Sequence, residues 1–207
     1  MKVTQFYKQE LVKRGYGSDA AQQAAIDRLQ VCQDEWLSYK EVRSGKLAKM
    51  MRFPELPRGV YMWGGVGRGK SFLMDCFYEA SPVEKKTRLH FHEFMREVHR
   101  ELQELSGKAD PLEILGKNIA KRYRLICFDE FHVSDVADAM ILYRLLDSLF
   151  KNRVQFVMTS NYRPDLLYPD GLHRDRILPA IALLQEKLDI MNVDAGIDYR
   201  QKVMEQV

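Results

Sequence analysis

Residues 58–71 read RGVYMWGGVGRGKS, and this stretch decides the fold. Its first half, residues 59–63, is apolar and rich in β-branched and aromatic side chains, which predicts a short buried strand. Its second half fits the pattern G-x-x-x-x-G-K-[ST], and residues 72–80 continue it as a helical segment, FLMDCFYEA. The order of strand, glycine-rich loop and helix predicts a loop that binds the phosphates of a nucleotide.

The residue types of this loop suit phosphate chemistry. Glycines let backbone N–H groups approach phosphate oxygens, and the helix N-terminus that follows adds partial positive charge. We expect the Lys70 amine to contact the β- and γ-phosphates, and the Ser71 hydroxyl to bind Mg²⁺, a hard ion that prefers oxygen ligands. A glycine-rich turn that only caps a helix explains neither residue. The predicted nucleotide-binding residues are Gly64, Gly65, Val66, Gly67, Arg68, Gly69, Lys70, Ser71 and Phe72.

Downstream of the loop, short apolar strands alternate with helices. Strands separated by helical crossovers form a parallel sheet that is covered on both faces. The sequence therefore predicts an α/β fold of the P-loop NTPase type, preceded by a helical segment that begins near Ser18 and a basic connector over residues 40–52. The predicted strands cover residues 59–63, 88–92, 125–128, 154–159 and 189–193.

Helix signals lie between these strands. We expect Ser18 and Ser134 to be N-caps and Pro111 and Pro179 to lie in first helical turns. After Ser134, the spacing of apolar residues predicts a buried stripe that consists of Val136, Met140, Tyr143, Leu146 and Phe150.

Two carboxylates end the predicted strand in RLICFDEF, residues 124–131. In a P-loop fold this strand lies beside the phosphate loop. We therefore expect Asp129 to hold Mg²⁺, directly or through water, and Glu130 to activate the attacking water. A single acidic residue at a strand end is often only solvated, but the pair follows a phosphate loop in the same alternation. The pair predicts a nucleotide hydrolase.

The strand in VQFVMTSN, residues 154–161, also ends in polar groups, and Asn161 is positioned to orient the water and sense the γ-phosphate. Taken alone, an asparagine after a strand is ordinarily a turn residue. Further on, Arg174 and Arg176 either flank a helix as exposed charges or, in a ring, reach a neighbouring copy's nucleotide as an arginine finger.

Composition excludes several classes of protein. The 207 residues are 46% hydrophobic and 29% charged, which is typical of a globular chain. The net charge of +3 is too small to indicate nucleic acid or an anionic membrane as the partner. No apolar run approaches the roughly 20 residues that span a bilayer. The three cysteines stand far apart, which favours a reducing, cytoplasmic compartment and gives no zinc site.

Three of the histidines are close enough in the sequence to be considered as ligands of a metal site. His90 and His92 would share one side of the predicted strand, with His99 following in the next helix. No fourth ligand has a suitable spacing, so hydrogen-bonded histidines are the preferred interpretation. Trp36 and the Met50–Met51 pair are interpreted as packing residues.

These motifs together resemble one family. The segments RGVYMWGGVGRGKSFLMD, RLHFHEFM, ICFDEFHVSDVADAMIL, TSN, LYPDGLHRDRILPAI and NVDAGIDYR run almost continuously from Arg58 to Arg200 and are similar to the AFG1-like AAA+ ATPases. The resemblance implies an AAA+ sheet with strand order 5-1-4-3-2 and Mg²⁺-dependent ATP hydrolysis. For the bacterial branch it also implies a role in cell division through the tubulin-like Z-ring protein FtsZ.

The resemblance also assigns residues. Lys70 and Ser71 match the family's Walker A motif and Asp129 and Glu130 its Walker B motif. Asn161 matches its sensor.

Other matches lie outside these motifs. Arg174 matches the family's arginine, which favours it over Arg176 as a finger in a homo-oligomeric ring. Asp19 and Gln22 form a D-x-x-Q arrangement similar to the family's start, which assigns them to the adenine side of the nucleotide. His173 stands where the family has glutamine, and His132 also departs from the usual residue.

The family continues beyond GIDYR, so the chain is expected to be a truncated member. Residues 1–57 would form a helical segment and connector, and residues 58–207 an ATPase core without its C-terminal lid. We expect a cytoplasmic ATPase that acts on a protein partner at the division site. Two alternatives stay open: a nucleotide-dependent binding switch with little hydrolysis, and a helicase-loader-like AAA+ protein that acts on DNA.

Overall fold

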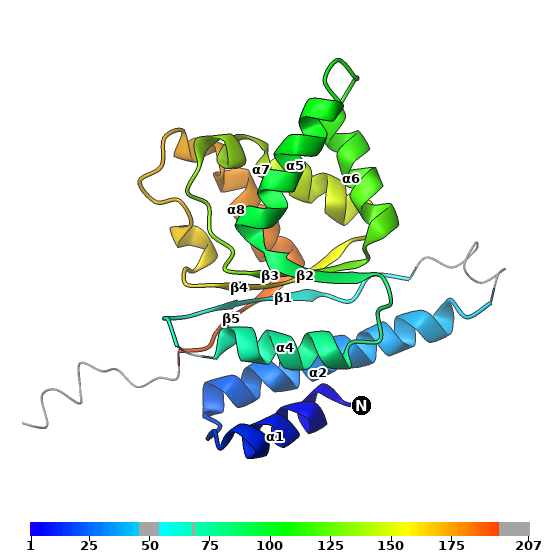
Figure 1. Cartoon of the computed structure of the whole chain (residues 1–207), viewed down its shortest axis with the longest axis vertical. Coiled ribbons are helices and arrows are strands. Elements are labelled where there is room, and N and C mark those ends of the chain that lie inside the picture. Colours follow the sequence, from blue (N-terminus) through cyan, green and yellow to red (C-terminus); the bar gives the residue numbers. More distant parts are fainter. Residues whose placement is uncertain (46–53, 68, 195–207) are drawn as a thin grey trace, which may run out of the picture.

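A five-stranded parallel sheet lies between two layers of helices (Figure 1). The structure, a computed structural model, describes residues 1–45, 54–67 and 69–194. Its strand order, β2-β3-β4-β1-β5, confirms the predicted order 5-1-4-3-2. The described elements are α1 (Val3–Arg14), α2 (Ala20–Val42), β1 (Gly59–Trp63), α4 (Lys70–Ala80), β2 (Lys86–His90), α5 (Phe91–Glu104), α6 (Pro111–Arg122), β3 (Leu125–Asp129), α7 (Val136–Lys151), β4 (Gln155–Ser160), the 3₁₀ turns η1 (Pro164–Leu166) and η2 (Arg174–Arg176), α8 (Leu178–Lys187) and β5 (Leu188–Asn192).

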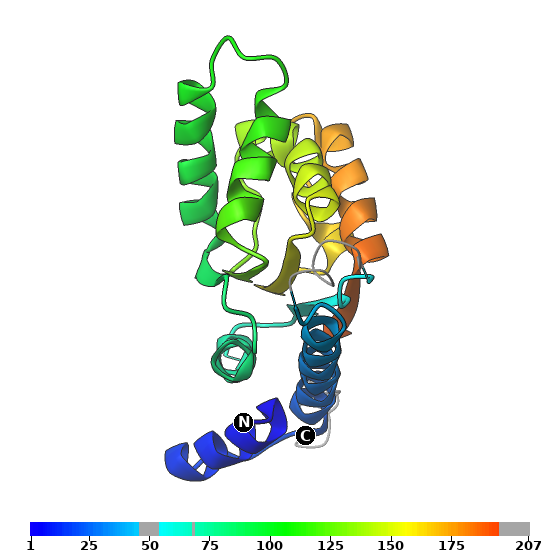
Figure 2. The ribbon, with the colours of Figure 1, turned by 90° about the vertical axis from the view of Figure 1, so that its right-hand side faces the viewer.

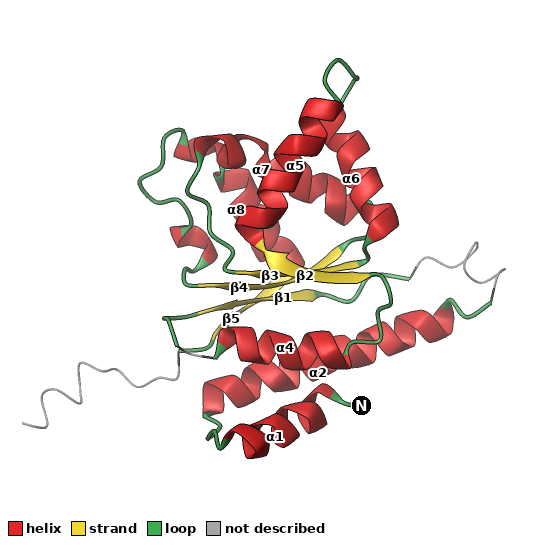
Figure 3. Ribbon diagram, viewed as in Figure 1, coloured by secondary structure: helices red, strands yellow, loops and turns green. Residues whose placement is uncertain are grey.

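Each face of the sheet has its own apolar core, because successive side chains of a strand point to opposite faces. In β1, Val60 and Met62 belong to the core under α1, α2 and α4, whereas Tyr61 belongs to the core under α5, α6, α7 and α8. In β3, Cys127 and Phe128 divide in the same way. Figure 3 shows the yellow strands enclosed by red helices on both sides. Burial on both faces explains why the central strands read as continuous apolar runs.

The N-terminal helix α1 was not expected from the sequence. It packs against α2 and α4 on their side away from the sheet (Figures 1 and 2). The apolar residues of this helix do not form a regular stripe along one face, and only Val3 and Tyr7 are buried. The buried Gln33 of α2 accepts a hydrogen bond from the Val3 N–H at 3.0 Å and donates to the Ala80 carbonyl at 2.6 Å. One amide thereby links α1, α2 and the end of α4.

Both predicted serine caps are wrong by one residue. Asp19 caps α2, because its Oδ1 accepts a hydrogen bond from the Gln22 N–H at 2.8 Å. Asp135 caps α7 in the same way. The Ser18 hydroxyl instead accepts a hydrogen bond from the Tyr7 hydroxyl at 2.8 Å. Where serine and aspartate stand side by side, both suit an N-cap, and the register of the helix decides between them. The predicted first-turn positions of Pro111 and Pro179 are confirmed.

The predicted buried stripe of α7 is also wrong. Val136, Met140 and Tyr143 are 37%, 48% and 40% exposed, and Leu146 alone of the five is fully buried. Helix α7 is apolar around more than one face, so the spacing fits two stripes, and the one richer in leucine faces the core. The buried residues of α7 are Ala139, Leu142, Leu145, Leu146, Ser148 and Leu149.

Strand β2 ends two residues earlier than predicted. It is a half-buried edge strand, and α5 begins at Phe91, so His92 lies in a helix and does not share a strand face with His90. The two imidazoles nevertheless stack, with ring centroids 5.6 Å apart. Trp36 is buried in the core as predicted. Helix α2 continues to Val42, and the rest of the predicted connector, including Met50 and Met51, lies largely outside the described residues.

Candidate functional site

The phosphate loop leaves β1 at the carboxyl edge of the sheet. The Gly64 N–H donates to the Ser160 carbonyl at 3.2 Å, which aligns the start of the loop with the end of β4. Gly67 and Gly69 have φ values of +78° and +75°, a left-handed backbone that glycine adopts without steric cost. Gly69 is the N-cap of α4, so the helix begins within the loop. Arg68, also predicted to bind nucleotide, lies outside the described residues.

The Lys70 side chain folds back over its own loop. Its Nζ donates to the carbonyl oxygens of Gly64 at 2.6 Å and Gly65 at 2.7 Å, and the residue is only 9% exposed. The Gly65 N–H donates to Oδ1 of Asp194, just after β5, at 2.8 Å. We did not predict Asp194; the NVD run that contains it was part of the family resemblance but had no role assigned. Both contacts fix the loop from within the protein.

Asp129 ends β3 as a buried carboxylate that is 7% exposed. Its Oδ2 accepts a hydrogen bond from Nε of Arg88 at 2.7 Å and lies 2.7 Å from Nη2 of the same guanidinium in an ion pair. Its Oδ1 accepts a longer bond, 3.3 Å, from the Thr159 hydroxyl. Arg88 also forms an ion pair with Asp75 of α4. The guanidinium therefore compensates a negative charge that would otherwise be costly to bury.

Glu130 differs from its neighbour in exposure. Its side chain is 73% exposed, and its backbone has a φ of +52°, which is unusual for a residue other than glycine. The Glu130 N–H donates to the Thr159 hydroxyl at 3.2 Å, and Oε2 lies 3.9 Å from Nδ1 of His90. The turned backbone separates the two carboxylates: one is buried and paired, and the other is exposed at the sheet edge.

A cavity of about 300 Å³ brings most of the predicted site together. The phosphate loop and the start of α4 line one part of it, and the end of β4 with the residues just after β3 and β4 lines another. An open cavity of this size suits the phosphate end of a small-molecule ligand. Its lining residues are Val66, Gly67, Gly69, Lys70, Ser71, Phe72, Glu130, Thr159, Ser160 and Asn161.

Asn161 is exposed at the end of β4, and the backbone on either side of it is fixed. The Ser160 hydroxyl donates to the Phe131 carbonyl at 2.7 Å and accepts from the Tyr162 N–H at 3.1 Å. The buried Tyr61 hydroxyl donates to the Tyr162 carbonyl at 2.9 Å. The amide of Asn161 is therefore presented to the cavity by a rigid turn.

Of the two N-terminal residues predicted to bind nucleotide, only Gln22 lies against the phosphate loop. Its Nε2 is close enough to Gly69 that a Cβ added there would lie 3.1 Å away. Its Oε1 lies 3.1 Å from the Tyr7 hydroxyl oxygen. Asp19 caps α2 by accepting a hydrogen bond from the Gln22 backbone N–H, and neither residue lines the cavity.

An aromatic group flanks the loop where α1 meets α4. The Phe72 ring lies 5.7 Å from Tyr7 and 6.3 Å from Tyr16, and the Arg14 guanidinium lies 4.9 Å from its centroid. Tyr16 is 60% exposed. Sequence reasoning missed this group because α1 was not predicted.

The two candidate arginine fingers lie on η2, which packs against α7 and α8. Nη2 of Arg174 donates to the Asp165 carbonyl at 2.8 Å, whereas Arg176 has a side chain that is 61% exposed. Neither residue lines the cavity of its own chain. The structure therefore does not bring them together with the other predicted catalytic residues.

The donor set of the site suits Mg²⁺. Ser71 offers a hydroxyl oxygen and Asp129 a carboxylate, which are the hard oxygen ligands that this ion prefers. Among residues 1–45, 54–67 and 69–194, no group of three or more His, Cys, Asp or Glu side chains is arranged to hold a metal. Mg²⁺ at nucleotide sites takes few protein ligands, because phosphate and water oxygens complete its shell. The residues present fit the ion.

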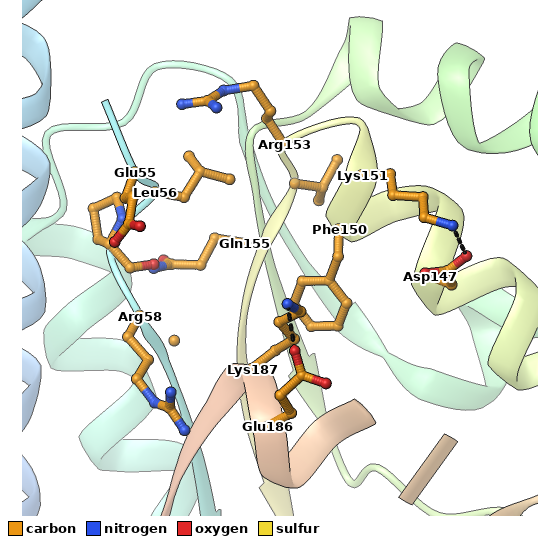
Figure 4. Close-up of a pocket in the computed structure, with 13 residues that line it drawn as sticks. Glu55, Leu56, Arg58, Asp147, Phe150, Lys151, Arg153, Gln155, Glu186 and Lys187 are labelled. Atoms are coloured by element: carbon orange, nitrogen blue, oxygen red, sulfur yellow. Dashed lines mark hydrogen bonds and ion pairs between the residues drawn. The ribbon is translucent and has the colours of Figure 1, made fainter. Parts of the chain in front are cut away.

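A larger hollow of about 720 Å³ lies at the opposite edge of the sheet, where β1 and β4 begin (Figure 4). Four of its charged residues form two ion pairs: Lys151 lies 2.6 Å from Asp147, and Lys187 lies 2.7 Å from Glu186. Arg58, also on its lining, contacts the Asp189 carboxylate. Its lining contains no residue of the phosphate loop and neither Glu130 nor Asn161, so it is not the candidate site.

In the part of the chain that the structure describes, no helix combines the length and the apolar character that a bilayer crossing requires.

A family model and the similar proteins both place the chain in one family. The family model described as AFG1-like ATPase matches residues 1–207. The chain is 44% identical to the cell division protein ZapE of Escherichia coli (strain K12), over 98% of this chain and 57% of that protein. It is also 44% identical to lactation elevated protein 1 homolog B of Danio rerio, over 73% of this chain and 32% of that protein. The chain thus spans at most a little over half the length of these relatives.

Solved structures support the fold. The replication initiator DnaA bound to AMPPCP and single-stranded DNA has a TM-score of 0.60 and 13% identity, over 93% of this chain and 52% of that one. The DnaC helicase loader has a TM-score of 0.50 and 12% identity, over 86% of this chain and 92% of that one. At such identities the likeness concerns the P-loop AAA+ fold alone.

Proposed function

This chain belongs to the AFG1-like ATPase family, and from that premise we propose that it binds ATP with Mg²⁺ and hydrolyses the γ-phosphate. The observation that carries the proposal is the cavity of about 300 Å³. It places the phosphate loop, Glu130 and Asn161 around one space. A loop that only capped a helix would not need a carboxylate and an amide on the facing strand ends.

The roles follow from the positions of the side chains. Lys70 exchanges its contacts with the loop carbonyls for the β- and γ-phosphates, and the loop N–H groups hold the phosphate oxygens. Ser71 and Asp129 would hold Mg²⁺, which when bound neutralises charge on the phosphates. Glu130, exposed at the cavity, accepts the proton of the attacking water, and Asn161 orients that water.

We further propose that the N-terminal helices of residues 1–57 complete the base side of the site in the core of residues 58–207, with Gln22 as the contact. Arg174 would act between copies in a homo-oligomer, since it does not reach the cavity of its own chain. The partner would be the Z-ring protein FtsZ or another division-site protein, a cytoplasmic role supported by the similarity to ZapE.

Phosphate release tests the enzymatic part of the proposal. We expect turnover with ATP and Mg²⁺ that rises with protein concentration and disappears in Lys70→Ala and Glu130→Gln. Lys85→Ala is the matched control, because Lys85 is exposed and donates to a backbone carbonyl outside the cavity. Equal phosphate release by Lys70→Ala and wild type would refute the proposal.

A second candidate, a nucleotide switch with little hydrolysis, is favoured by the internal contacts of Lys70 and Asp129. Lys70 contacts loop carbonyls that a bound nucleotide would replace, and Asp129 Oδ1 accepts a hydrogen bond from Thr159 that a bound metal would replace. Glu130→Gln, which should trap ATP, distinguishes the candidates in co-sedimentation with FtsZ polymers. The switch predicts that this variant binds FtsZ at least as well as wild type and that wild type shows nucleotide binding without turnover.

A further inference from the structure

Arg88 bridges two elements of the nucleotide site. It lies on β2, and its three guanidinium nitrogens divide between two carboxylates. Nε and Nη2 contact Oδ2 of Asp129, each at 2.7 Å, and Nη1 pairs with Asp75. Its side chain is 25% exposed, and that of Asp129 is 9% exposed. A guanidinium that directs two nitrogens at one carboxylate oxygen holds that oxygen in place as well as compensating its charge.

The bridge connects the two residues that would hold Mg²⁺. Asp75 lies four residues after Ser71 on α4, and residues at this spacing lie on the same face of a helix. Arg88 therefore links the helix that presents the Ser71 hydroxyl to the strand that presents the Asp129 carboxylate. In the absence of this link, the distance between the two oxygen donors would depend only on the packing of α4 against the sheet.

The two oxygens of Asp129 have unequal roles in this arrangement. Oδ2 contacts Nε and Nη2 of Arg88, whereas Oδ1 accepts one long hydrogen bond, 3.3 Å, from the Thr159 hydroxyl. A carboxylate held by one oxygen presents the other in a defined direction. The less strongly bonded Oδ1 is the oxygen that a metal or a metal-bound water would use.

We propose that Arg88 is a positioning residue of the ATPase site, which orients Asp129 and couples it through Asp75 to the helix of Ser71. The inference rests on the proposed function, because the oriented oxygen matters only if Mg²⁺ and nucleotide bind here. Arg88 itself touches neither the nucleotide nor the reacting water. Its contribution is to the geometry of the metal ligands.

Binding of a non-hydrolysable ATP analogue, AMPPNP, tests the proposal by isothermal titration calorimetry in EDTA and at increasing Mg²⁺. We expect Arg88→Met to need about tenfold more Mg²⁺ than wild type for half-maximal binding, in line with other residues that orient metal ligands. Weak binding in EDTA is expected to be equal in both proteins, because the phosphate loop is intact. Arg122→Met is the matched control, since Arg122 pairs with Glu101 away from the cavity.

Two conservative variants keep the test valid where Arg88→Met does not fold. Arg88→Lys retains the charge but not the fork, and Asp75→Asn removes only the link to α4. We expect both to shift the Mg²⁺ requirement upward, by less than Arg88→Met. If the variants melt earlier than wild type yet show its Mg²⁺ requirement, Arg88 has only a structural role and the proposal is overturned. If wild type itself fails to bind AMPPNP, the proposed function fails and this inference with it.

Discussion

Replacement of Gln155 by leucine tests how the N-terminal helices are joined to the sheet. Gln155 begins β4 and is 2% exposed. Its Oε1 accepts a hydrogen bond from Trp36 Nε1 of α2 at 2.9 Å, and its Nε2 donates to the Pro57 carbonyl ahead of β1. One amide therefore satisfies polar groups from two other segments inside the protein.

The expected cost follows from the two groups that lose their partner. A buried donor or acceptor left unsatisfied costs about 1–3 kcal/mol, so the Trp36 N–H and the Pro57 carbonyl together cost about 2–6 kcal/mol. Burial of the apolar leucine side chain in place of the amide stabilises the folded state by about 1–2 kcal/mol. We expect Gln155→Leu to lower the free energy of unfolding by about 3 kcal/mol, out of a usual total of about 5–15 kcal/mol.

Urea unfolding and thermal melts measure this change. In a chain of this size, a loss of about 3 kcal/mol corresponds to a fall in Tm of about 6–12 °C. Gln103→Leu, an exposed position on α5, is the control for the same chemical change. Trp36→Phe removes the donor, so the double variant should cost less than the sum of the two single variants. A Gln155→Leu protein within about 0.5 kcal/mol of wild type, or strict additivity in the cycle, would refute the reasoning.

Three further predictions concern other parts of the chain. Burial raises the pKa of Cys32 and of Cys76 to about 12, so both thiols should resist alkylation at pH 8 until urea is added. Between pH 9 and 12 these thiols deprotonate in the unfolded chain but not in the folded one, so the free energy of unfolding should fall as the pH rises through this range. Gly116→Ala should destabilise by about 1–3 kcal/mol in urea titrations, because its Cβ would lie 2.1 Å from the Ser148 hydroxyl oxygen, and Ser148→Gly should restore part of the loss, since glycine within α7 has a cost of its own. Asn161→Ala should lower the kcat for phosphate release about 100-fold with little change in KM, and an unchanged kcat would remove Asn161 from the catalytic group.

Motifs in the sequence predicted the parallel sheet, and the family resemblance predicted its strand order. The phosphate loop after β1 and the acidic end of β3 fix the fold type, and both lie where predicted. Glu130 and Asn161 come together because the carboxyl ends of parallel strands meet at one edge. For these residues, the motif in the sequence and the parallel arrangement of the strands predict the same site.

The rest depends on contacts between distant segments. The apolar residues of helix α1 do not gather on one face, so the helix is hard to recognise from its own sequence, and it is held by Gln33 and by packing on α4. Arg88 and Asp194 are polar residues whose partners lie 41 and 129 positions away. No spacing rule within a strand or helix predicts such pairs, so the ligand geometry around Asp129 required the structure.

The left-handed backbone of Glu130 lowers the stability of the folded protein at a position where the proposed hydrolysis needs a glutamate. A residue other than glycine at a φ of +52° carries a conformational cost of about 1–3 kcal/mol, which asparagine or glycine would largely avoid. A library of variants screened for heat resistance alone should therefore accumulate asparagine or glycine at this position and lose the proposed general base. A screen that also demands phosphate release should retain the glutamate and reach its stability through changes elsewhere in the chain.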